Sequence, residues 1–131
     1  MNRRFRTRFA FLISIAICGW SLPGLAIDDS SRAAARELVN NGASQFDQGH
    51  YDEALRSFMA AYEVAKVPTV AVWAARANEK LGKLVSASEL YESALLMQPN
   101  DLWVGNTQRD AQKQAELALK ALKPRIPTLR I

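Results

Sequence analysis

The sequence predicts an all-α protein in which two helix–turn–helix units stack behind a signal peptide helix and one long C-terminal helix covers the stack. The first observation is an internal repeat, because residues 49–62 return in altered form as residues 82–95. Four residue pairs recur 33 positions apart: Gly49 and Gly82, Ala54 and Ala87, Phe58 and Tyr91, and Ala61 and Ala94. The second observation is that apolar residues recur every three or four positions in both units, as in amphipathic helices. A fixed period of this length indicates stacked helical repeats.

Four helices are expected in the two units, over about residues 31–47, 51–66, 69–81 and 85–97. The units themselves cover about residues 35–67 and 68–101. Ser30 or Ser31 is expected to cap the first helix through its hydroxyl group. Gly49 and Gly82 end the first helix of each unit, since glycine readily adopts the left-handed conformation of a helix C-terminus. Pro68 separates the units, because the residue before a proline avoids helical geometry.

A capping helix is expected over about residues 102–123, which completes a helical domain of residues 27–123. Thr107 followed by Asp110 resembles a capping box, although the helix could also begin near Asp101. Its apolar stripe would cover the face that a repeat stack leaves open at its end. Residues 124–131 are expected to form an extended, strand-like tail, because their two prolines disfavour a helix.

Residues 1–26 have the three parts of a secretory signal peptide. A basic segment precedes an apolar run of 14 residues, which is followed by small residues before a predicted cleavage at Ile27. That run is shorter than the roughly 20 residues of a membrane-spanning helix, although an uncleaved anchor is the alternative. The single cysteine, Cys18, lies inside the apolar run. We therefore expect export to the periplasm or cell envelope, with secretion as a variant, and membrane contact only through the signal segment.

The basic net charge of the chain, +4, comes from its N-terminus. From Ile27 onward the chain carries 13 basic and 13 acidic residues, so a nucleic-acid partner is not expected. Residues 28–101 are acidic and residues 102–131 are basic. We interpret the basic segment as a solvated helix face, with self-association or an acidic polymer as alternatives.

No arrangement of residues predicts catalysis. His50 is the only histidine, and with Asp47 and Asp52 it would form at most an incomplete metal site in an exposed turn. The chain has no serine–histidine pair in a pocket, no phosphate loop and no dinucleotide fingerprint. We therefore expect a protein that is not an enzyme and holds no cofactor and no metal.

A partner-binding groove is the sharper hypothesis, because the first helices of stacked pairs line a concave surface. The candidate residues of the first unit are Arg36, Asn40, Ala43 and Asp47. Those of the second unit are Thr69, Val72, Arg76, Glu79 and Lys80. Such a mixed polar surface suits an extended peptide or a helix. The alternative is that two repeats form too short an array for a dedicated ligand.

The two helix–turn–helix units resemble the tetratricopeptide repeat. The matching positions are Gly42, Gly49, Tyr51, Ala54, Phe58 and Ala61, then Gly82, Ala87, Tyr91, Ala94 and Pro99. Residues 68–69, 73–85 and 123–131 are also similar to a group of secreted Gram-negative bacterial repeat proteins, in which a helical module often precedes a β-rich domain. The chain departs from the repeat at Asn78 and His50. Val39, Ala43 and Trp73 occupy positions where relatives that clamp a peptide carboxylate have Lys or Asn, so that specificity is not expected.

The resemblance implies an exported, non-enzymatic protein–protein interaction scaffold that binds a protein or peptide through its groove. The alternative is a truncated structural or accessory fragment, acting through homo-oligomerisation or strand pairing of its C-terminal tail.

Overall fold

The computed structural model describes residues 28–127, and within them it confirms the all-α prediction, with five packed helices and no strand. The helices are α1 (Asp29–Asp47), α2 (Tyr51–Val64), α3 (Pro68–Lys80), α4 (Leu84–Leu96) and α5 (Thr107–Leu122), followed by the 3-10 turn η1 (Lys123–Arg125). The predicted signal peptide, residues 1–26, and the last four residues of the predicted tail lie outside the described residues.

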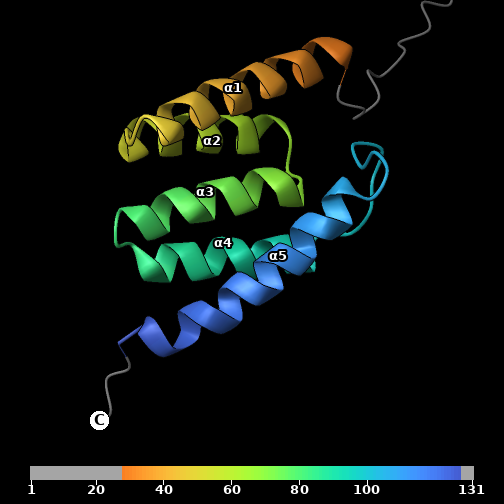
Figure 1. The fold of residues 1–131 in the computed structure, drawn as a ribbon. Coiled ribbons are helices and arrows are strands. Elements are labelled where there is room, and N and C mark those ends of the chain that lie inside the picture. Colours follow the sequence, from red (N-terminus) through yellow and green to blue (C-terminus); the bar gives the residue numbers. More distant parts are fainter. Residues whose placement is uncertain (1–27, 128–131) are drawn as a thin grey trace, which may run out of the picture.

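The helices form two hairpins and a crossing helix (Figure 1). α1 packs on α2 and α3 packs on α4, while α2 also contacts α3 and joins the two hairpins. α5 packs on both α3 and α4, and runs obliquely across the second hairpin. The far face of the second hairpin is therefore covered by a single helix.

The two hairpin turns have the same backbone structure. Gly49 and Gly82 have φ angles of 81° and 74°. In the first turn the Gly49 amide donates to Phe46 O and the His50 amide to Gln45 O. In the second turn the Gly82 amide donates to Glu79 O and the Lys83 amide to Asn78 O. Each pair of bonds is a Schellman motif, which satisfies carbonyls at the end of a helix and needs a left-handed residue.

Small residues set the distance between the helices of each hairpin. A Cβ atom added to Gly42 on α1 would lie 2.7 Å from the Phe58 ring on α2. The positions that follow 33 residues later are Ala75 and Tyr91, and both are buried in one cluster. In the first hairpin the ring of Phe58 thus lies against a small residue of the opposite helix, and the second hairpin has a ring and a small residue at the corresponding positions of one cluster. Burial of a ring such as that of Phe58 contributes about 1.5–3 kcal/mol.

The apolar face of α5 completes the core of the second hairpin. Ala111, Ala115, Leu119 and Leu122 are buried in the same cluster as Tyr91. These four α5 residues belong to the apolar stripe predicted from the spacing.

Two glutamines on successive turns of α5 also cap the second hairpin. The Gln108 side-chain oxygen accepts hydrogen bonds from the Thr69 amide at 3.0 Å and the Thr69 hydroxyl at 2.6 Å. The Gln112 side-chain amide donates to the carbonyls of Ala94 and Leu95 on α4 and of Met97 just beyond it. α5 therefore supplies an acceptor to the free amides at the start of α3 and a donor to the free carbonyls at the end of α4.

The start of α1 differs from the prediction. Its N-cap is Asp28, whose carboxylate accepts from the Ser31 amide at 2.8 Å, and Ser30 and Ser31 lie within the first turn. A carboxylate is a strong cap because it carries a charge toward the positive end of the helix dipole. The hydrogen bonds from Ser31 lower the pKa of Asp28.

The junction between the hairpins also differs slightly. α2 ends at Val64, two residues before the predicted end, and α3 begins at Pro68 itself. Val67 is extended, with φ of −129° and ψ of 151°, as the residue before a proline prefers. Proline suits the first helical position because its missing N–H would have no partner there.

The capping box predicted for α5 does not form. Thr107 is the first helical residue, and the N-cap is Asn106, whose side chain makes no capping hydrogen bond. The predicted extended tail is wrong at its start, because Pro124 and Arg125 belong to η1. Proline is tolerated in the first turn of a helix, so it continues the chain for one 3-10 turn after α5.

Candidate functional site

Two cavities lie along α3. The first, which we call the loop-side cavity, has a volume of about 230 Å³ and lies between α1, the N-terminal half of α3, the α4–α5 loop and Gln108. The second, which we call the turn-side cavity, has a volume of about 450 Å³ and lies beside the two hairpin turns, with Arg125 at its edge. We refer to the surface that contains both cavities as the α3 groove.

Seven of the nine predicted groove residues are divided between the two cavities, whereas Ala43 and Val72 line neither. Those that line the loop-side cavity are Arg36, Asn40 and Thr69. Those that line the turn-side cavity are Asp47, Arg76, Glu79 and Lys80. The sequence periodicity therefore predicted residues of one surface, but it did not predict that they line two separate cavities.

Three of these seven residues bind α5 or η1 within the same chain. Thr69 contacts Gln108, as described above, and Arg76 Nη2 donates to Gln114 Oε1 at 2.8 Å. Glu79 Oε2 lies 3.3 Å from Arg125 Nη1. The side of the groove toward α5 is consequently held by intramolecular contacts.

Glu79 also joins the core to the groove. Its Oε1 atom accepts the hydroxyl proton of Tyr91 at 2.6 Å, while its other oxygen faces Arg125. Burial of the phenol, strengthened by the hydrogen bond to Glu79, raises the pKa of Tyr91 well above its usual range. Tyr91 is therefore a neutral donor that positions the Glu79 carboxylate.

Aromatic rings form the wall of the turn-side cavity. Phe46 packs edge-on to Tyr51 and Trp73, with centroid separations of 5.1 and 5.7 Å, and Trp73 stacks on Phe58 at 5.5 Å. The Arg76 guanidinium lies 5.2 Å from the Trp73 ring centroid. This contact and the bond to Gln114 hold Arg76 in place from two sides.

The loop-side cavity is mainly apolar, and the sequence analysis missed most of it. The additional lining residues are Arg32, Ala35, Val39, Ala65, Val67, Val70, Asp101, Leu102, Val104 and Gln108. Leu102 and Trp103, from the α4–α5 loop, pack against Ala61, Val67 and Val70. The signal in the sequence was the apolar run of residues 102–104, which the prediction placed in a capping helix.

Val72, which the sequence analysis placed in the groove, lies in the core. It is 3% exposed and belongs to the cluster that α5 completes. The periodicity marked a helix face correctly, but it could not show that α5 covers part of that face.

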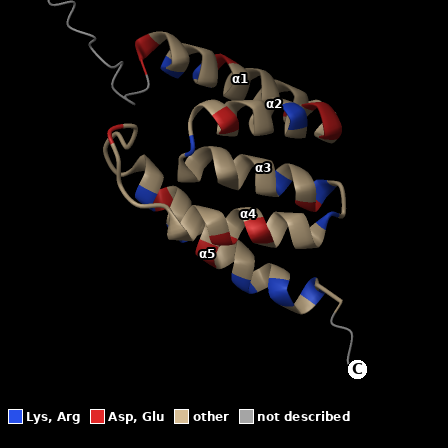
Figure 2. Cartoon of the chain, turned by 180° about the vertical axis from the view of Figure 1, so that it is seen from behind, with Lys and Arg blue, Asp and Glu red and all other residues tan. Residues whose placement is uncertain are grey.

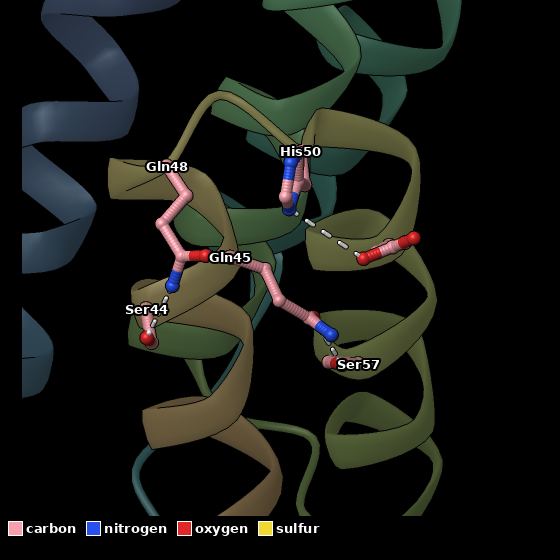
Figure 3. Close-up of polar contacts among 6 residues, drawn as sticks. Ser44, Gln45, Gln48, His50 and Ser57 are labelled. Atoms are coloured by element: carbon pink, nitrogen blue, oxygen red, sulfur yellow. Dashed lines mark hydrogen bonds and ion pairs between the residues drawn. The ribbon is translucent and has the colours of Figure 1, made fainter.

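Polar side chains contact one another around the first hairpin turn (Figure 3). His50 Nδ1 lies 3.8 Å from Glu53 Oε2, and the Ser57 hydroxyl donates to Gln45 at 2.8 Å. Among residues 28–127, no three His, Cys, Asp or Glu side chains are grouped so that they could hold a metal ion. No helix in this part of the chain is both long enough and apolar enough to cross a membrane.

Comparisons with models of protein families, with curated proteins and with solved structures give no match to this chain.

Proposed function

We propose that this protein is an exported, non-enzymatic scaffold of the tetratricopeptide type, which binds an extended segment of a partner protein in the α3 groove. The observation that carries the proposal is that two cavities follow one another along α3. Both are lined by the first helix of each hairpin, where such repeats present their concave surface. The matching Schellman turns and the small residue opposite each buried ring support the repeat assignment.

The length of the groove sets the size of the segment. α3 has 13 residues, which corresponds to about 20 Å at about 1.5 Å per residue. An extended chain advances about 3.3 Å per residue, so about six residues reach from one cavity to the other. A contact of this size is small, which favours a transient interaction.

Affinity capture from cell-envelope extracts tests the proposal through a matched pair of variants. Arg36→Glu reverses a charge at the loop-side cavity, whereas Arg56→Glu makes the same change on an exposed position of α2 that lines neither cavity. The partner is expected to remain bound to Arg56→Glu and to be lost from Arg36→Glu. Equal retention by both variants would mean that the groove does not hold the partner.

Export is proposed from the signal peptide pattern of residues 1–26. N-terminal sequencing of the protein recovered from the cell envelope is expected to begin at Ile27. A retained Met1 would contradict cleavage.

A further inference from the structure

The loop-side cavity has the size of a side-chain pocket rather than that of a cofactor site. Its volume of about 230 Å³ lies below the roughly 300–1,000 Å³ of typical small-molecule sites. Its walls are largely aliphatic, with Val39 on α1, Val70 on α3 and Leu102 on the loop. Val104, at the edge of the cavity, is 73% exposed, which is high for an aliphatic side chain in a folded domain. These features suit one aliphatic side chain of a bound segment.

The α1 wall of the same cavity is cationic. Within residues 28–127, Arg36 makes no ion pair and no side-chain hydrogen bond. Arg32 Nη1 is 3.9 Å from Asp29, a fully exposed carboxylate, and such a pair contributes little. The Arg32 Nε atom is buried without a partner. Both guanidinium groups therefore retain donors for a ligand.

The two cavities together carry positive charge on a body that is nearly neutral. Five cationic and three anionic side chains line them, a net charge of plus two. Residues 28–127 as a whole carry 12 basic and 13 acidic residues. Figure 2 shows basic residues on α1 and α3, beside the acidic residues of the same helices. The lining of the cavities is therefore more basic than the body as a whole, which favours an acidic partner.

We infer that the loop-side cavity takes an aliphatic side chain of an acidic peptide segment, and that a neighbouring carboxylate of this segment pairs with Arg36 and Arg32. The aliphatic group enters between α1, α3 and the α4–α5 loop and lies against Val104. The carboxylate lies over the α1 wall, where a planar guanidinium can donate two hydrogen bonds to it. This inference rests on the proposed function and specifies the chemistry of the partner.

The test uses a displayed library of random heptapeptides, selected on the immobilised full chain. Selected peptides are then synthesised with a fluorescent label, an acetylated N-terminus and either a free or an amidated C-terminus. The expected consensus is an aliphatic residue beside Asp or Glu. Binding measured by fluorescence anisotropy is expected to persist in the amidated form, because the recognised carboxylate belongs to a side chain.

Arg36→Ala is expected to lower the affinity for the acidic peptide about tenfold, as the loss of one charge-assisted hydrogen bond does. It should leave a peptide with Gln in place of the acidic residue nearly unaffected. Val104→Ser should lower the affinity for both peptides equally. Because Val104 is exposed, this substitution should leave the protein folded. Arg56→Ala, on α2, is the matched control and should bind like the parent protein.

The outcomes separate this inference from the proposed function. Selected peptides that need Arg36 or Val104 but share a basic or neutral consensus would overturn the acidic inference and leave the groove function standing. Peptides that bind only with a free C-terminus would likewise overturn the side-chain assignment. Failure to select any peptide whose binding depends on the groove would overturn both.

Discussion

Tyr91 on α4 donates its hydroxyl to Oε1 of Glu79 on α3 at 2.6 Å. In the first hairpin, the positions 33 residues earlier are Phe58 and Phe46, which pack in one apolar cluster. Tyr91 has a hydroxyl group that Phe58 lacks. Glu79, at the position that corresponds to Phe46, supplies the acceptor that a buried hydroxyl requires. The second hairpin thereby gains a carboxylate that also reaches Arg125 on η1.

The stability of the fold is expected to fall at alkaline pH because of Tyr91. Its pKa is raised in the folded state, chiefly by burial, and is about 10 in the unfolded state. Below about pH 10 both states bind the phenolic proton, so its contribution is fully present. Above that pH only the unfolded state ionises, and the free energy of unfolding falls by about 1.4 kcal/mol per pH unit.

Urea unfolding of the parent and Tyr91→Phe between about pH 9 and pH 11, around the usual tyrosine pKa, measures this effect. The variant should lack the additional alkaline slope. At neutral pH it should be less stable by about 1.5–3 kcal/mol, since a hydrogen bond to a charged acceptor is lost. An identical alkaline slope in both proteins would show that another group is responsible.

Gly42→Ala is expected to destabilise the protein by about 1–2 kcal/mol, although alanine favours a helix by about 1 kcal/mol. The added Cβ would lie 2.7 and 2.8 Å from two atoms of the buried Phe58 ring, so the ring must shift or α1 and α2 must separate. Chemical denaturation of the variant measures the loss.

A double-mutant cycle with Phe58→Leu distinguishes overpacking from other causes. The smaller side chain gives space to the added methyl group, so Gly42→Ala should cost less in the Phe58→Leu background. Strictly additive effects would argue against a clash between these two positions.

Gly49→Ala and Gly82→Ala should each cost about 1 kcal/mol through the backbone alone. Their φ angles are positive, and a Cβ at either position would meet no atom within 4 Å. Asn tolerates the left-handed region better, so Gly49→Asn and Gly82→Asn should be milder in a thermal or urea denaturation series. Equal losses for Ala and Asn would exclude the positive φ as the cause.

Gln108→Ala should destabilise the start of α3 by about 1 kcal/mol, as the loss of a helix cap does. Amide hydrogen exchange in the first turn of α3 should accelerate. Gln108→Glu keeps the acceptor and places a negative charge at the positive end of the helix dipole, so it should preserve protection. Gln114→Ala, which loses only an exposed bond to Arg76, is the control and should have little effect.

The helix order and the two hairpin turns could be predicted from the sequence, because glycine positions and apolar spacing are local properties. The helix ends were less predictable. Asp28 rather than a serine caps α1, and the local pattern at Thr107 and Asp110 resembled a capping box that does not form. Competing caps differ little in free energy, so packing at a helix end decides between them.

The sequence by itself determined that two similar helical hairpins form and which helix faces pack together. Apolar residues recur with the helical period of about 3.6 residues, and glycines mark the two turns. Only the tertiary structure decided what α5 does. Its oblique crossing brings Gln108 and Gln112 to the ends of α3 and α4, and engages Arg76. The loop that leads into α5 also places Leu102 beside α3. These contacts join residues far apart in the chain, and no local pattern encodes the angle at which one helix crosses another.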